Sequence, residues 1–152
     1  MLVNNAGVAV VKPFGEITSI EWEQTQGVNV TAPFLLTQRF APEMPPGASI
    51  VNILSVAAKT GFANWSAYCM SKFALEGFSQ SVREELRGRK IRVINVYPAA
   101  TDTEIWNQIE GKWPRHKMIS PKDVASAVIY ALSQPADVAV ENITLSNLTG
   151  NL

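Results

Sequence analysis

Hydrophobic residues along the chain form short apolar runs that alternate with longer stretches of helical periodicity. Residues 48–54 (ASIVNIL) and 91–97 (IRVINVY) are rich in β-branched side chains and apolar on both faces, which is typical of buried strands. Residues 138–145 (VAVENITL) show this pattern more weakly, and Leu2-Val3 indicates the end of a further strand. We therefore predict four strands.

Helical patterns separate these strands. The first covers residues 18–44 and begins with a capping box, because Glu21 follows Thr18 by three positions. Gly27 and Pro33 are expected to bend or break this helix.

The second helix is predicted over residues 66–87 and ends at Gly88. Its apolar residues repeat on one side (Leu75, Phe78 and Val82), whereas Arg83, Glu84 and Glu85 lie partly on the other. A third helix begins at residues 120–123, where a serine, a proline and an acidic residue form an N-terminal signal.

This alternation predicts an α/β fold of the Rossmann-like, doubly wound type, with a parallel sheet covered on both faces and right-handed crossovers. Ligands of such sheets bind beyond the carboxyl ends of the strands. The residues that follow each strand are therefore the candidate site. Residues 99–118 form a long loop with one short helix, and loops of this length are usually functional or mobile.

Composition narrows the possible functions. The 152 residues carry 13 basic and 13 acidic side chains with a pI near 6.6, which argues against a nucleic-acid binder. Cys69 is the only cysteine, so we expect no intrachain disulfide and a reducing, cytoplasmic location. No apolar run has the length of a membrane span, and His116 has no second histidine or cysteine at ligand spacing. We expect neither a membrane protein nor a metal site.

The helix that starts at residue 66 carries the candidate chemistry. Tyr68 and Lys72 are four residues apart, so their side chains share a face. A phenol has a pKa of about 10, and a nearby ammonium would lower that pKa into the range for proton transfer. Ser55, 68 − 55 = 13 positions before the tyrosine, lies at a strand end and can bind the same substrate oxygen. Taken alone, such a pair is more often a half-buried aromatic and a solvated lysine.

Four features together resemble the short-chain dehydrogenase/reductase family over nearly the whole chain. They are LVNNAG at residues 2–7, Asn29 within VNV, Ser55, and the YxxxK pattern of residues 68–72. YxxxK alone is a weak signal, because the spacing occurs by chance in many helices. The four features in family order are a strong one.

The resemblance implies a role for each catalytic candidate. Tyr68 would be the general acid/base for the substrate oxygen, and Lys72 would hold the nicotinamide ribose hydroxyls and lower the pKa of Tyr68. Ser55 would steady the substrate oxygen. Asn29 would hold a water that connects Lys72 to solvent.

The implied cofactor is NAD or NADP, which supplies the hydride. Asn5, Ala6 and Gly7 would approach it through their backbone, and Pro98, Thr101 and Thr103 would lie near the nicotinamide carboxamide and phosphate. Thr101 and Thr103 can equally be turn formers or the N-cap of the following short helix. The residues that choose between NAD and NADP in the family follow its first two strands.

The chain departs from the family pattern in two places. Ala99 follows Pro98 where the family usually has glycine, and no TGxxxGxG turn for the cofactor pyrophosphate occurs. By resemblance, the family strand order 3-2-1-4-5-6-7 is reduced to the C-terminal half, 4-5-6-7. We therefore expect residues 1–152 to form a single partial domain of about four strands, whose first strand is an edge.

The predicted function is an NAD(P)-dependent oxidoreductase that transfers hydride between nicotinamide and a small alcohol or carbonyl substrate. For lack of the glycine-rich turn, the isolated chain is expected to be inactive. The alternative is a catalytically silent interaction module that dimerises. A homo-oligomer is expected through residues 27–44 and 66–87, although these helices must also pack on the sheet. Trp106, Trp113 and Met118 either cover the substrate or pack the loop onto the domain.

Overall fold

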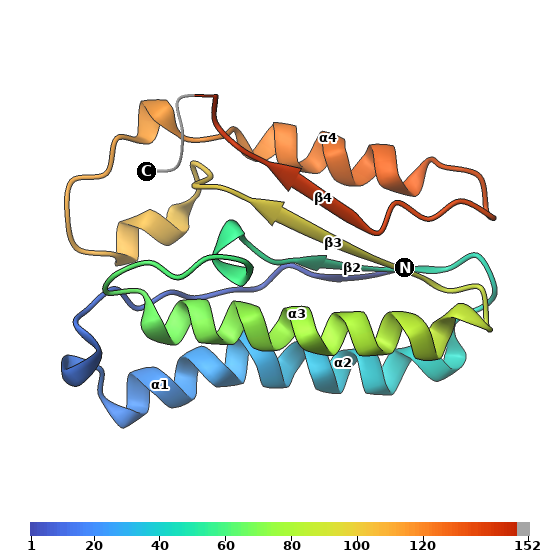
Figure 1. Ribbon diagram of the computed structural model, residues 1–152, viewed down its shortest axis with the longest axis horizontal. Coiled ribbons are helices and arrows are strands. Elements are labelled where there is room, and N and C mark those ends of the chain that lie inside the picture. Colours follow the sequence, from blue (N-terminus) through green and yellow to red (C-terminus); the bar gives the residue numbers. More distant parts are fainter. Residues whose placement is uncertain (149–152) are drawn as a thin grey trace.

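The computed structural model describes residues 1–148 as a parallel sheet between two layers of helices (Figure 1). The sheet has four strands in the order β1-β2-β3-β4, namely β1 (Leu2–Asn4), β2 (Ser49–Ile53), β3 (Arg92–Pro98) and β4 (Asn142–Leu145). The α/β class and the four strands are thus confirmed. The fourth strand starts later than predicted, because the Val138 N–H donates to the carbonyl of Pro135 in a turn.

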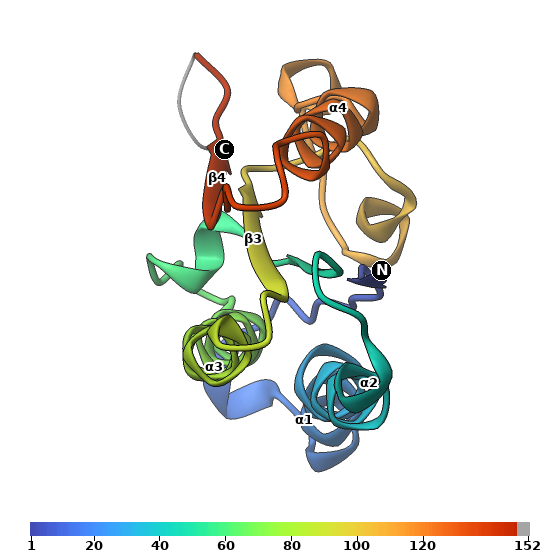
Figure 2. The ribbon, with the colours of Figure 1, turned by 90° about the vertical axis from the view of Figure 1, so that its right-hand side faces the viewer.

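The helices cover both faces of the sheet, as predicted. They are α1 (Ser19–Gln26), α2 (Ala32–Phe40), α3 (Ser66–Arg87) and α4 (Pro121–Leu132). In Figure 2, α1, α2 and α3 lie on one side of the strands and α4 lies on the other. No helix within residues 1–148 is both long and apolar enough to cross a bilayer.

The first helical segment is widened rather than broken. Its predicted capping box is confirmed, since the Thr18 side chain accepts from the Glu21 N–H and Glu21 accepts from the Thr18 N–H. Residues Gly27–Thr31 then form a π-helical turn, and α2 follows with Pro33 in its first turn. Pro33 has no N–H to donate, so a regular α-helical bond is missing where the helix widens.

Alternate strand residues fill the two sides of the sheet. Ile50 and Val93 pack with Leu86 of α3, while Val51 and Ile94 pack toward α4. Because β4 extends the sheet in the same direction as β2 and β3 but α4 lies on the opposite face, the last crossover has the opposite hand to the one through α3. The prediction of uniformly right-handed crossovers is therefore wrong for the connection through α4.

A row of asparagines runs across the sheet in register. Asn4 lies beside Asn52, Asn52 beside Asn95, and Asn95 beside Asn142. The Asn4 amide donates to Asn52 Oδ1 at 2.8 Å, and the Asn52 amide donates to Asn95 Oδ1 at 3.3 Å. The side chain of Asn4 thus bonds to Asn52 in the sheet and to Thr37 of α2.

Helix α3 places polar side chains against this row. Ser79 accepts from the Asn52 amide at 2.9 Å and donates to Asn95 Oδ1 at 2.5 Å. Arg83 is buried and donates from Nε to the Val93 carbonyl at 3.1 Å, so its predicted position partly on the solvent side is wrong. Each polar atom of a buried asparagine needs a hydrogen-bond partner. These bonds therefore fix both the register of the strands and the position of α3 on the sheet.

Asn52→Ala is expected to lower the free energy of unfolding by about 3 kcal/mol, because buried partners on three elements lose their hydrogen bonds. Urea unfolding followed by circular dichroism measures this loss. Asn107→Ala, which removes an exposed amide in the loop, should cost under about 0.5 kcal/mol. Equal losses in the two variants would contradict a stabilising role for the row.

Candidate functional site

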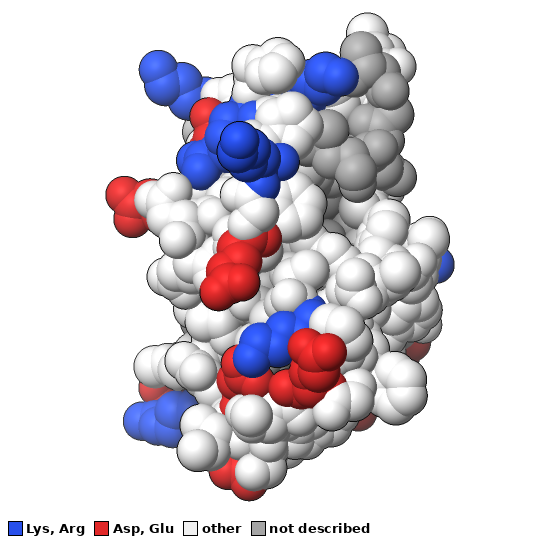
Figure 3. Space-filling model, turned by 90° about the vertical axis from the view of Figure 1, so that its left-hand side faces the viewer, with Lys and Arg blue, Asp and Glu red and all other residues white. Residues whose placement is uncertain are grey.

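A cleft of about 830 Å³ opens at the carboxyl ends of the strands. Nearly all site residues predicted from the sequence line it, namely Asn5, Ala6, Gly7, Ser55, Tyr68, Lys72, Pro98, Thr101 and Thr103. Asn29 lies behind the wall. Figure 3, which looks onto the end of the molecule toward which the strands point, shows uncharged atoms between small groups of charged side chains of both signs.

Tyr68 and Lys72 project from the first turns of α3, and Lys72 is only 4% exposed. The Lys72 Nζ donates to the Ile53 carbonyl at 3.0 Å, at the end of β2. It lies 5.6 Å from the centre of the Tyr68 ring. The ammonium is therefore held beneath the phenol by the helix spacing and by the strand end.

Ser55 begins the 3-10 turn Val56–Ala58 directly after β2. Its Oγ accepts from the Ala57 N–H at 3.1 Å, and its side chain also shares a hydrogen bond with Tyr68. Ser55 is thus both a loop-start hydroxyl and a partner of the phenol. A carbonyl oxygen placed in the cleft can be bound by both hydroxyl groups.

The pKa values follow burial. Removal from water raises the pKa of Tyr68, and its hydrogen bond with Ser55 offsets part of that rise. Burial lowers the pKa of Lys72 to about 8. The prediction that Lys72 lowers the Tyr68 pKa is wrong for this arrangement, because burial disfavours the charged form of both groups.

Asn29 occupies the π-helical turn and is 1% exposed. Its amide bonds to Val8 in both directions, with Val8 N–H to Asn29 Oδ1 at 3.0 Å and Asn29 Nδ2 to the Val8 carbonyl at 2.9 Å. Nδ2 also donates to Ser71 Oγ at 2.9 Å. A Cβ on Gly7 would lie 3.7 Å from both Asn29 Oδ1 and Lys72 Nζ. Asn29 therefore joins the segment after β1 to α3, and its role toward water stays a prediction.

The segment after β3 is a turn. The Thr101 hydroxyl donates to the Ala99 carbonyl at 2.9 Å, and Thr103 caps the 3-10 helix Glu104–Gln108 without a side-chain bond. Within residues 1–148, positive φ angles at non-glycine residues occur only at Asn64 and Lys90. Ala99 therefore sits in ordinary backbone, and this position does not need glycine.

The cleft residues fit the nicotinamide and ribose part of a dinucleotide. A lysine ammonium, a phenol and the close backbone of Asn5–Gly7 face one space. The sequence offers no glycine-rich turn at a helix start for the pyrophosphate. The described residues thus provide binding groups for the nicotinamide and its ribose, but not for the pyrophosphate.

Glu76 is a positioning residue that the sequence analysis missed. It accepts from Lys59 Nζ at 2.6 Å and from the Tyr97 hydroxyl at 2.5 Å. Burial opposes ionisation of Glu76, but the hydrogen bonds from Lys59, Tyr97 and Gln80 outweigh it and lower the pKa. Because Lys59 follows the turn that holds Ser55, this contact ties that turn to α3. The spacing of Lys72, Glu76, Ser79 and Arg83 on one helix face was the available signal.

Three tryptophans form one wall of the cleft. Trp65 precedes α3, and Trp106 and Trp113 come from the loop after β3. Trp65 and Tyr68 are in edge contact with ring centres 5.5 Å apart. Both loop tryptophans therefore line the cleft and pack the loop against Trp65, while their covering of a substrate stays a prediction.

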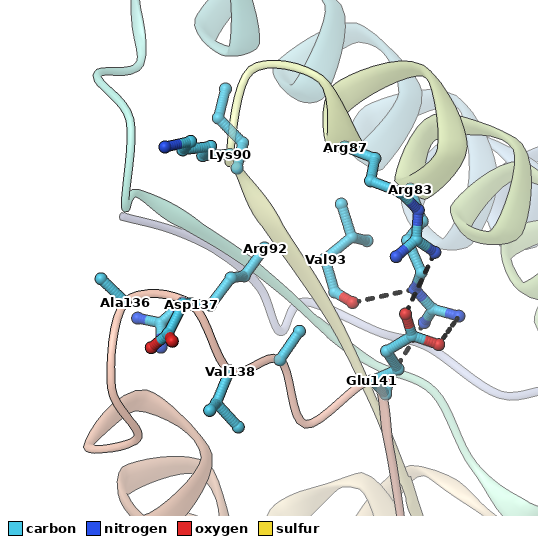
Figure 4. Close-up of a pocket in the computed structure, with 11 residues that line it drawn as sticks. Arg83, Arg87, Lys90, Arg92, Val93, Ala136, Asp137, Val138 and Glu141 are labelled. Atoms are coloured by element: carbon cyan, nitrogen blue, oxygen red, sulfur yellow. Dashed lines mark hydrogen bonds and ion pairs between the residues drawn. The ribbon is translucent and has the colours of Figure 1, made fainter.

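A second cavity, of about 400 Å³, lies at the opposite ends of the strands (Figure 4). Arg83, Arg87 and Arg92 line it, but their donors are engaged. Arg83 binds the Val93 and Glu141 carbonyls, Arg87 binds Glu84 and Glu141 carboxylates, and Arg92 binds the Leu132 and Gln134 carbonyls. These arginines cap strand and helix ends, which is a structural role. Residues 1–148 contain no cluster of three potential metal ligands.

Similarity to known proteins agrees with this geometry. The family model described as short chain dehydrogenase matches residues 1–113. The chain belongs to the short-chain dehydrogenase/reductase family. The sepiapterin reductase of Chlorobaculum tepidum is 33% identical over 153 aligned positions, which cover 99% of this chain and 62% of that protein.

Solved structures of this family share the fold. Serine dehydrogenase from Escherichia coli superposes with a TM-score of 0.84 at 26% identity, covering 99% of this chain and 65% of that one. A metagenomic short-chain oxidoreductase in complex with NADP has a TM-score of 0.77 at 32% identity, covering 95% and 59%. The chain thus spans less than two thirds of the length of these dehydrogenases and reductases.

The buried lysine gives a pH prediction. Since the unfolded state keeps the Lys72 proton up to about pH 10.5 and the folded state loses it from about 8, the free energy of unfolding should rise with pH between these values. The slope approaches about 1.4 kcal/mol per pH unit. Lys72→Met is expected to abolish this rise in urea unfolding measured from pH 7 to 10. Lys122→Met, at an exposed lysine of α4, should retain it; a rise that persists in Lys72→Met would contradict the assignment.

Proposed function

We propose that this chain forms the catalytic side of an NAD(P)-dependent oxidoreductase that interconverts a small alcohol and its carbonyl compound. One observation carries this proposal: Ser55, Tyr68 and a buried Lys72 face one cleft at the mouth of the sheet. Relatives named as dehydrogenases and reductases, and neighbours bound to NADP or NADPH, support it.

Tyr68 would donate its proton to the carbonyl oxygen during reduction and take it back during oxidation. Ser55 would hold that oxygen through its hydroxyl. Burial keeps Tyr68 in the protonated form, which is the form a reduction requires at its start. Lys72 has a pKa of about 8, which is near neutrality, so its ammonium group can supply the proton that Tyr68 has given up.

A nicotinamide cofactor, when bound, supplies or accepts the hydride. Lys72 and the backbone of Asn5, Ala6 and Gly7 would hold its ribose, and Pro98, Thr101 and Thr103 would border the ring. NAD and NADP remain equal candidates, since the phosphate-reading residues of the family lie outside the matched features. The protein is proposed to act in the cytoplasm.

In a protein that turns over substrate, Tyr68→Phe should abolish turnover while leaving cofactor affinity within about twofold, because the phenyl ring keeps its packing but has no proton to give. Binding is measured by titrating NADH and NADPH against tryptophan fluorescence, since Trp65 contacts Tyr68. Turnover is followed at 340 nm with carbonyl substrates. An unchanged kcat in Tyr68→Phe removes the residue from the mechanism. Absence of saturable binding of either cofactor favours the silent interaction module instead.

A homo-oligomer is also proposed, on the apolar surface of α2 and α3. Five large apolar side chains there are 42–51% exposed, namely Phe34, Leu35, Leu36, Phe40 and Phe73. Exposed apolar groups gathered on neighbouring helices are typical of an association surface.

Phe73→Glu is expected to shift the chain toward the monomer, because a buried carboxylate in the interface has no partner. Light scattering after size exclusion measures the mass. Phe14→Glu introduces the same charge at an exposed position away from these helices and should leave the mass unchanged. If the chain without substitutions is a monomer at every concentration measured, the proposed homo-oligomer is contradicted.

A further inference from the structure

We propose that the preferred substrates are uncharged carbonyl compounds with a flat aromatic or fused-ring body, bound against Trp65, Trp106 and Trp113. This inference rests on the proposed function, because it assigns the substrate class of the same cleft. It concerns the wall beside Tyr68, which is built entirely by this chain.

The three indole rings form one aromatic cluster on the wall of the cleft, with their planes tilted by 50–73° to one another. Trp65 lies 5.9 Å from Trp106 and 6.1 Å from Trp113, and Trp106 lies 4.9 Å from Trp113, all between ring centres. Trp65 also contacts Tyr68 at 5.5 Å. The cluster therefore begins directly beside the proton donor, where the body of a substrate would lie once its carbonyl oxygen meets Tyr68.

The polar edges of two of these rings are already used. Trp106 Nε1 donates to the Thr101 carbonyl at 2.8 Å, and Trp113 Nε1 donates to the Ile109 carbonyl at 3.4 Å. Their N–H groups are therefore not donors for hydroxyl-rich substrates. What these rings offer to a ligand is π-surface, which favours stacked and edge contacts with another ring.

The small number of charged residues in the cleft also favours an uncharged substrate. Of the described residues that line it, only Lys72 and Glu104 are charged, and Lys72 donates to the Ile53 carbonyl. Val56, Phe62, Ile105 and Ile109 extend the apolar wall around the tryptophans. An anionic substrate would find no second cation near this wall, and a polyol would leave those hydroxyls that face the tryptophans without partners.

The loop is built to hold its rings in place. Thr101 forms a parallel bridge with Ile119, which closes the base of the loop, and Asp102 pairs with Arg115 within it. Gly111 has φ of 127°, and a Cβ there would lie 3.4 Å from Trp113 Nε1. The glycine therefore lets the chain turn back so that the Trp113 ring packs over it.

The test uses the chain as it exists and three probes: 2-acetylnaphthalene, its carboxylate-bearing analogue, and the polyol ketone xylulose. Binding is measured by calorimetry with NADPH present and absent. The uncharged aromatic ketone should bind at least roughly tenfold more tightly than either of the other probes. Equal or tighter binding of the anionic or the polyol probe would overturn the inference.

Trp106→Leu and Trp113→Leu should each weaken binding of the aromatic ketone roughly tenfold, whereas Trp106→Phe, which keeps a ring, should lose little. Trp22→Leu is the matched control, because Trp22 lies on α1 outside the cleft, and it should not change affinity. Circular dichroism verifies folding of each variant. Unchanged affinity in folded Trp106→Leu and Trp113→Leu would overturn the inference.

The outcome also separates this inference from the proposed function. Tyr68→Phe should retain affinity for the aromatic ketone while losing turnover. If Tyr68→Phe keeps turnover but the tryptophan variants lose binding, the proton-transfer assignment fails and the substrate class stands. If cofactor binds saturably but the aromatic probe does not prefer the cleft, the substrate class fails alone.

Discussion

The hydrogen-bonded contact between the asparagine row of the sheet and the polar stripe of α3 supports everything else in this structure. Buried amides leave little freedom, since each needs a partner at a fixed place. A shift of β2 by one residue would bring Ile53 or Val51 opposite Ser79 in place of Asn52. Because Tyr68 and Lys72 stand on the same helix, the bonds that align the strands also set the height of the phenol above the strand ends.

The sequence was sufficient for the features that depend on local pattern. Strand runs, the Thr18 cap and the pair at residues 68 and 72 follow from periodicity and spacing, and the structure has them. The predictions that were wrong concern groups whose behaviour depends on burial. Arg83 was expected partly in solvent because a charge usually lies there, yet carbonyls at two strand ends hold it inside. The direction of the Tyr68 pKa was missed for the same reason, since no spacing states how dry a cleft is.

The asparagine row shows why other parts were out of reach. Each strand run contains one asparagine, which alone suggests a turn or a weak point in a strand. Their common role appears only when the strands are aligned side by side, a relation between residues about 40 to 50 positions apart. Glu76 is similar, because its two strongest partners come from the turn after β2 and from β3. Polar networks between residues far apart in the sequence leave no local pattern from which they could be predicted.

The bridge between Thr101 and Ile119 has an evolutionary consequence. It encloses an excursion of the chain whose ends are already paired, so its interior can change in length or composition without moving β3 or α4. In the proposed function, proton transfer depends on β2 and α3, whereas substrate recognition depends on this loop. On that proposal, exchange of the about 17 residues between the paired ends would change the substrate, while the residues proposed for proton transfer stay the same.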